Sequence, residues 1–310
     1  MNKRLLAMFA LLATFWGTSF VAIEVGLHAF PPLLFAALRY DVAGLIILGY
    51  AALTTDRWLP RAKDEFLLVA ITGVTIIGAY HGLLYLGAQH VPGAIAAVII
   101  SLSPVLTAVF ASTLLPDQSL HPLGIAGLLA GLVGVVVIAN PDPSNLLSAS
   151  MLGIVLIFLG TASFALGSVL TRPIRSDLPL PTLQGWAMLL GSGLLHVVSV
   201  ARGESFAAIE WTLPAVTSLT YLTLISGVVA FLLYFELLDI LGPIEINLIG
   251  YLEPVVASTM SFLLLGHVIN APTLAGFVAI FVGFALIKYE TLQAALHTAS
   301  ARARRTTHRF

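Results

Sequence analysis

The sequence predicts an all-α integral membrane protein whose ten transmembrane helices form two inverted five-helix repeats. Three observations lead to this fold class. Of the 310 residues, 59% are apolar and 9% are charged, whereas a soluble domain carries roughly 25% charged residues. Ten long apolar runs follow one another with short breaks between them. Features of the first half of the chain then recur in the second half at an offset of about 150 residues.

Each apolar run is long enough to cross a bilayer as a helix, which needs roughly 17–25 residues. The runs are 5–27, 33–53, 66–86, 93–115, 123–139, 151–170, 182–200, 215–238, 244–265 and 273–289. Helix-breaking residues separate them, as at Pro31-Pro32 and Gly242-Pro243. Buried strands would be shorter, and strands facing lipid would alternate apolar and polar residues in a closed barrel. The runs lack that alternation, so we expect helices.

The first run follows Lys3-Arg4 and resembles the start of a signal peptide. Cleavable signal peptides have an apolar stretch of about 7–15 residues before a small-residue cleavage site. The 5–27 run is longer and has no clear site of that kind, so we expect it to be retained as the first transmembrane helix.

The basic residues predict the orientation, because cytoplasmic loops of membrane proteins are enriched in Lys and Arg. With the N-terminus in the cytoplasm, the outside loops receive only Arg202, and Arg39 falls within a span. The inside receives Lys3, Arg4, Arg57, Arg61, Lys63, Arg172, Arg175, Lys288, Arg302, Arg304, Arg305 and Arg309. This partition predicts a multi-pass protein with both termini in the cytoplasm.

The internal similarity consists of prolines and glycines at a nearly constant offset. The matched pairs are Pro104 and Pro254, Pro122 and Pro272, Pro32 and Pro181, Gly44 and Gly193, Gly127 and Gly276, and Gly134 and Gly283. We expect residues 1–145 to form the first repeat, and 146–310 the second repeat with a short basic cytoplasmic tail. Because each half holds five helices, the second must enter from the opposite side, an inverted repeat typical of secondary transporters.

These features resemble the drug/metabolite transporter superfamily, and within it the EamA-type ten-helix exporters. The resemblance rests on the 16–20 stretch Trp-Gly-Thr-Ser-Phe, on Pro104 and Pro254, and on the paired glycines of the last helix in each half. It extends from about residue 5 to residue 289. Many relatives carry Leu-Gly-Glu where this chain has Leu265-Gly266-His267, a departure that we expect to affect a loop rather than transport.

The resemblance implies a secondary transporter in the plasma (inner) membrane of a prokaryote, exporting small amphipathic metabolites such as amino acids or related compounds. Transport would proceed by alternating access around a central cavity. Multidrug or organic-cation export and uncoupled facilitation remain open alternatives. Protons are a candidate coupling ion, and the expected partners are a small-molecule substrate and lipid, with no nucleic acid.

Polar and aromatic residues within the spans are the candidates for substrate binding. Ionisable groups there cost at least a few kcal/mol and so require a reason. The candidate substrate-binding residues are Trp16, Phe20, His81, Tyr85, Ser101, Ser103, Phe164, Asn247, Tyr251 and Glu253. Pro104 and Pro254 are expected to kink their helices, because proline removes a backbone hydrogen bond. Each candidate also has a plain structural interpretation, in which it packs or hydrogen-bonds inside the bundle.

Glu24 and Arg39 lie at similar depth in the first two spans, with a short loop between them. We therefore expect an ion pair, acting as a structural clamp or as an outer gate. An intramembrane enzyme is the third possible class, and Ser192 with His196 is the one conceivable dyad. A single helix often places two such residues side by side by chance, so we expect no enzyme, no catalytic residues, no cofactor and no metal site; the chain also has no cysteine.

Overall fold

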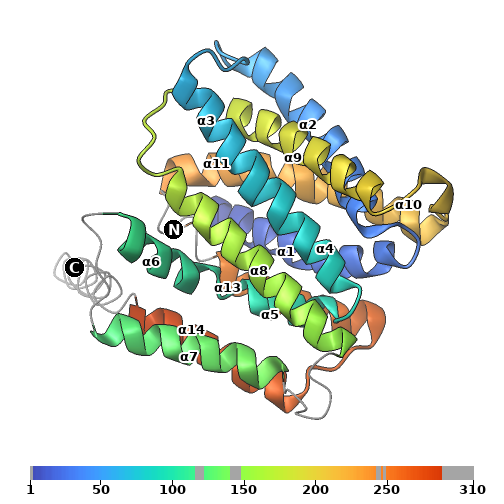
Figure 1. The fold of residues 1–310 in the computed structure, drawn as a ribbon, viewed down its shortest axis with the longest axis vertical. Helices are drawn as coiled ribbons and strands as arrows, with labels where there is room; N and C mark the ends of the chain where they lie inside the picture. The colour runs from blue at the N-terminus through green and yellow to red at the C-terminus, as the bar shows by residue number, and fades with distance from the viewer. Residues whose placement is uncertain (1–2, 116–121, 140–147, 242–245, 247–248, 288–310) are drawn as a thin grey trace.

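The computed structural model describes residues 3–115, 122–139, 148–241, 246 and 249–287 (Figure 1). Every regular element among these residues is a helix. Seven helices are long and apolar enough to cross a membrane. They span Arg4–Leu27, Pro32–Thr54, Lys63–Ala88, Gly93–Leu114, Ser150–Leu170, Leu180–Ala201 and Leu213–Leu241. Three shorter apolar helices, Pro122–Ile138, Leu252–Leu265 and Ala271–Gly283, fall where the other expected spans lie. The protein is therefore a multi-pass helical membrane protein.

Some of these long helices consist of several successive elements. The first half contains α1 (Lys3–Leu27), α2 (Pro32–Thr54), α3 (Lys63–Ile71), η1 (Thr72–Ala79), α4 (Tyr80–Ala88), α5 (Gly93–Ile100), α6 (Ser103–Leu114) and α7 (Pro122–Ala139). The second half contains α8 (Ala149–Leu170), α9 (Leu180–Ala201), η2 (Phe206–Ala208), α10 (Leu213–Thr220), η3 (Tyr221–Val229), α11 (Ala230–Leu241), α13 (Ile249–Leu265) and α14 (Ala271–Ile287).

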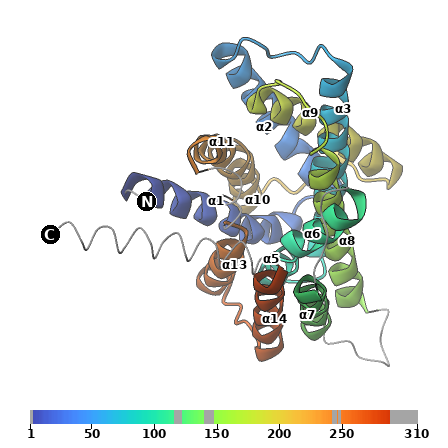
Figure 2. The same cartoon turned by 90° about the vertical axis from the view of Figure 1, so that its left-hand side faces the viewer.

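Two pairs of helices from opposite halves of the chain lie side by side at the two ends of the molecule. Both views show α2 beside α9 at one end and α7 beside α14 at the other (Figures 1 and 2). Between these pairs, α1 packs against α13 and against α10, η3 and α11, while α8 packs against α4, η1 and α6. The main hydrophobic core lies where α1, α2, α4 and α5 meet, and includes Phe20, Phe35 and Tyr85.

The expected 93–115 helix is interrupted. α5 ends at Ile100, Ser101 and Leu102 form a turn, and α6 begins at Ser103 with Pro104 in its first turn. Proline suits the first turn of a helix because its missing N–H has no intrahelical acceptor there. By contrast, α13 continues as a helix through Pro254.

The third and eighth apolar runs each contain a stretch of π-helix, a rare form that occurs mostly as short insertions at functional sites. η1 and η3 begin 149 residues apart, at Thr72 and Tyr221. Side chains from other helices bond their carbonyl groups. Ser163 Oγ of α8 donates to the Thr75 oxygen at 2.9 Å, and Trp16 Nε1 of α1 donates to the Ser226 oxygen at 3.3 Å.

Polar contacts fix the α2–α9 pair along its length. Glu204, which follows α9, accepts hydrogen bonds from the backbone N–H groups of Leu33 and Leu34 at the start of α2. A carboxylate in this place satisfies free N–H groups and complements the helix dipole. Farther along, His196 Nε2 lies 2.7 Å from Asp41 Oδ2. The histidine considered above as half of a dyad thus bridges two helices instead.

Candidate functional site

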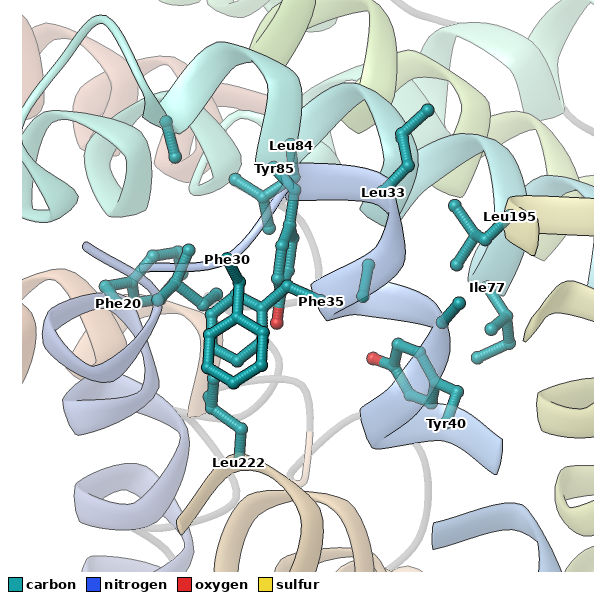
Figure 3. Close-up of a cluster of buried hydrophobic side chains, with 14 of the residues drawn as sticks. Phe20, Phe30, Leu33, Phe35, Tyr40, Ile77, Leu84, Tyr85, Leu195 and Leu222 are labelled. Atoms are coloured by element: carbon teal, nitrogen blue, oxygen red, sulfur yellow. The ribbon is translucent and has the colours of Figure 1, made fainter. Parts of the chain in front are cut away.

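Arg39 of α2 lies in the interior of the bundle, with 3% of its surface exposed. Its Nη1 donates a hydrogen bond of 2.8 Å to the hydroxyl oxygen of Tyr85 on α4. Its guanidinium carbon lies 4.6 Å from the centroid of the Tyr40 ring, which is a cation–π contact. Tyr40 and Tyr85 extend their hydroxyl groups toward the space between them (Figure 3). Aromatic groups therefore surround this buried charge.

His81 connects α4 to α2 beside this arginine. Its Nδ1 lies 3.1 Å from the carbonyl oxygen of Ile77, which can only accept, so Nδ1 carries the proton. Its Nε2 lies 2.5 Å from the hydroxyl oxygen of Tyr40 and can then accept a hydrogen bond from that hydroxyl. These partners fit a neutral imidazole with its proton on Nδ1.

Tyr80 extends the group toward α8. Its ring lies 4.4 Å from that of His81 and 5.3 Å from that of Phe164, between centroids. Gly160 lets α8 approach, since a Cβ there would lie 3.0 Å from the Tyr80 carbonyl oxygen. We call Arg39, Tyr40, Tyr80, His81 and Tyr85 the Arg39 cluster; Phe164 adjoins it from the second half of the chain.

Glu253 lies on α13, which packs closely against α1. A Cβ at Gly17 would lie 3.0 Å from the Glu253 carbonyl oxygen and 2.6 Å from Cβ of Val256. The glycine of the 16–20 stretch is therefore a point of close helix contact. Pro254 has no N–H to donate to the carbonyl of Gly250 one turn earlier, so a carboxylate and a freed carbonyl group lie near each other on α13.

The arrangement so far is a set of buried polar and aromatic side chains drawn from helices of both halves of a membrane protein. The sequence profile of the EamA-like transporter family matches this chain twice, over residues 4–140 and again over 151–289. The chain belongs to the EamA-like transporter family.

Named relatives span nearly the whole chain. An uncharacterized transporter of Bacillus subtilis, YvbV, is 27% identical over 286 residues, covering 92% of each chain. The uncharacterized inner membrane transporter YedA of Escherichia coli is 29% identical over 272 residues, covering 87% of this chain and 83% of the relative. Protein PecM of Dickeya dadantii is 28% identical over 277 residues, covering 88% of each.

A solved structure shares this fold, with a TM-score of 0.63 at 19% identity over 93% of this chain and 98% of the other. The family and the names of these relatives indicate a transporter rather than an enzyme.

Trp16 and Phe20, the aromatic candidates of the first helix, lie in different packing clusters. The Trp16 ring contacts Phe231 and Tyr234 of α11 at centroid distances of 5.3 and 5.5 Å. Phe20 is buried in the main core with Tyr85. The Arg39 cluster therefore adjoins Phe20, whereas Trp16 belongs to the contact between α1 and the η3–α11 helix.

The serine candidates lie at the break between α5 and α6. Ser101 is buried, and its Oγ donates to the Val98 carbonyl oxygen at 2.6 Å, so its proton is bonded within its own turn. Ser103 is partly buried at the start of α6. Asn247 and the side chain of Tyr251 lie outside the described residues.

The expected Glu24–Arg39 ion pair is wrong, because the two side chains have different partners. Glu24 Oε2 accepts the backbone N–H of Gly93 at 2.7 Å, and its Oε1 lies 3.3 Å from Nδ1 of His267. The pair was expected because the two residues lie at a similar depth along their helices. Arg39 instead faces α4, and Glu24 faces the start of α5. Glu24 thus joins α1, the start of α5 and the α13–α14 loop.

Replacing Glu24 with Ala is expected to lower the free energy of unfolding by about 1–3 kcal/mol, the usual cost of losing the partner of a largely buried donor. Thermal unfolding of the detergent-purified protein measures this loss. Glu236→Ala is the matched control, since it removes an exposed ion pair with Arg4, and such pairs contribute about 0–1 kcal/mol. Equal effects of the two changes would contradict a structural role for Glu24.

Two members of the Arg39 cluster were absent from the candidate list. Tyr40 follows Arg39 directly, and Tyr80 precedes His81. Adjacent residues point about 100° apart on a helix, so neither shared a stripe with the candidate beside it. The sequence signal that could have identified them is a tyrosine directly beside an ionisable residue within a span, as at Arg39-Tyr40 and Tyr80-His81.

The second feature that could hold a ligand is a cavity of about 540 Å³ between α2, the start of α9, and the η3–α11 helix. Its lining combines Tyr50 and Phe235 with two acids, Glu236 and Asp239. Among the described residues, no three His, Asp or Glu side chains gather as a metal site would require.

Proposed function

We propose that the protein is a secondary transporter that exports small amphipathic metabolites, amino acids or related compounds, by alternating access. The observation that carries this proposal is the Arg39 cluster, with Phe164 adjoining it from the second half of the chain. Secondary transporters place their substrate site between repeats. Aromatic rings with a few fixed polar groups suit an amphipathic solute.

We infer the repeat itself, residues 1–145 and 146–310, from three kinds of support. The family profile matches once in each half, and the two π-helices begin at equivalent positions. Hydrogen bonds to them are also exchanged between halves. The second half's Ser163 donates to η1 of the first, and the first half's Trp16 donates to η3 of the second.

The glycines of α7 and α14 support an inverted relation between the halves. A Cβ at Gly134 would lie 2.6 Å from the Gly276 oxygen, and one at Gly283 would lie 2.4 Å from the Gly127 oxygen. In the repeat, Gly127 corresponds to Gly276, and Gly134 corresponds to Gly283. The contact of Gly134 with Gly276 therefore has an equivalent with the halves exchanged, the contact of Gly283 with Gly127. Such an exchange is what a two-fold axis produces. Because the helices are antiparallel, that axis is perpendicular to them and would lie in the membrane plane.

The acidic cavity favours organic-cation export as a second candidate function. Two carboxylates beside two aromatic rings would attract a lipophilic cation. Glu236, however, also pairs with Arg4, and the cavity adjoins helices near their ends rather than the Arg39 cluster. We propose amino acids or related solutes as the substrates, a plasma (inner) membrane location and cytoplasmic termini.

Uptake of labelled amino acids into proteoliposomes, with and without a pH gradient, tests the proposed function. Saturable uptake of apolar or aromatic amino acids, absent from empty liposomes, is the expected result. A protein that moves no amino acid but protects cells from toxic organic cations would instead be a drug exporter.

A further inference from the structure

Arg39 is a buried cation that forms no ion pair within the described part of the chain. Its surface is 3% exposed, and its only direct polar contact among these residues is with a neutral hydroxyl, that of Tyr85. Asp41, two residues away, lies against His196, and Glu24 bonds Gly93 and His267. A buried charge without a counter-charge is costly, because neither a hydroxyl nor a ring face offsets the full loss of hydration.

Two hydrogen-bond donors at this position have no acceptor among the described residues. The first is Nε of Arg39, which is buried and unpartnered. The second is the hydroxyl of Tyr85, which accepts the bond from Arg39 and so keeps its own proton for another acceptor. An N–H and an O–H from two different helices, next to a positive charge, together suit an anionic oxygen ligand.

The surroundings decide what kind of molecule would carry that anion. Phe35 contacts the Tyr85 ring at 5.4 Å, and Phe30 stacks on Phe35 at 4.6 Å, between centroids. Figure 3 shows these rings and Leu222 gathered around the hydroxyl of Tyr85. A single guanidinium in an apolar and aromatic setting matches one carboxylate, whose two oxygens fit its fork of donors, on an apolar body.

We propose that Arg39 and Tyr85 form the subsite for a carboxylate group of the transported solute, so that substrates are apolar or aromatic carboxylates, amino acids included, and not organic cations. This inference rests on the proposed transport function and narrows it. A cation entering this position would meet the permanent charge of Arg39, which has no acid paired with it among the described residues.

Three probes of one shape separate the contributions of the two charged groups: L-phenylalanine, 3-phenylpropionate without the amine, and phenethylamine without the carboxylate. Binding to the full-length protein in nanodiscs is measured by calorimetry. We expect both carboxylates to bind the wild type and phenethylamine to bind at least tenfold more weakly. Arg39→Gln should raise the Kd of 3-phenylpropionate about 10- to 100-fold, as expected for the loss of charge-assisted hydrogen bonds.

Arg39→Lys and Tyr85→Phe keep the test decisive if Arg39→Gln does not fold. Lysine preserves the charge without the planar fork, so part of the affinity for 3-phenylpropionate should remain. Tyr85→Phe should weaken the two carboxylates and leave phenethylamine unchanged. Arg4→Gln, which removes an exposed arginine, is the control that should alter none of the three affinities.

Preferential binding of phenethylamine, wild-type carboxylate affinity in the folded Arg39 variants, or no binding of any carboxylate would overturn the subsite. The outcomes for the proposed function are separate. If amines are transported and the Arg39 variants transport them equally well, the protein is a transporter but the carboxylate subsite is wrong. If carboxylates bind in an Arg39-dependent way but no flux occurs in proteoliposomes, the subsite is supported and the transport function is contradicted.

Discussion

Replacing Glu253 with Gln is expected to abolish solute uptake driven by a pH gradient, while exchange of solute across the membrane at equal pH continues. Glutamine keeps the shape of the side chain and its ability to hydrogen-bond, but it cannot bind and release a proton. Glu253 lies next to Pro254 on α13, close to Gly17 of α1. A carboxylate in that setting can carry a proton between the two sides when the halves move.

The measurement compares gradient-driven uptake and equal-pH exchange in the same proteoliposomes. Glu210→Gln is the matched control, because this glutamate is exposed in the loop before α10 and should leave both activities unchanged. Gradient-driven uptake that persists in Glu253→Gln would contradict proton coupling at this residue. Loss of both activities at once would instead give Glu253 a role in binding the solute.

The parts of the fold that follow from local sequence could be predicted. Apolar length defined the helical runs, and Pro31-Pro32 marked the start of α2. At Pro104 the sequence predicted a kink within one helix, whereas a new helix begins there. The π-helices could not be predicted, because a π turn is stabilised by tertiary contacts. Ser163 and Trp16 provide these contacts from helices that lie far away in the sequence.

For the candidate site, the sequence likewise predicted the individual residues but not their contacts. Arg39, His81, Tyr85 and Glu253 stood out because polar groups inside a membrane span are costly. Their partners did not, since depth along a helix says nothing about the direction in which a side chain points. Arg39 was paired with an acid at equal depth, yet it faces two tyrosines that hydropathy alone treats as ordinary residues.

Replacing Gly276 with Leu is expected to prevent α7 and α14 from packing and to lower the free energy of unfolding by about 3 kcal/mol or more. A Cβ at Gly276 would lie 2.5 Å from the Gly134 oxygen and 2.4 Å from Cγ1 of Ile138. Overpacking usually costs about 1–3 kcal/mol. Here the obstacle includes the backbone, so the helices must separate, and loss of monodisperse protein on size-exclusion chromatography reports it.

Gly193→Leu is the control that distinguishes close packing from a general effect of removing glycine from a helix. Gly193 lies within α9, and a Cβ there would have no neighbour within 4 Å. We therefore expect it to be tolerated, with a gain in helix propensity of up to about 1 kcal/mol. If Gly134→Leu behaves as Gly276→Leu does, the two halves contribute equivalent glycines to one contact. If Gly134→Leu or Gly276→Leu is tolerated, α7 and α14 do not pack closely at these glycines. The strongest support for the inverted repeat would then be lost.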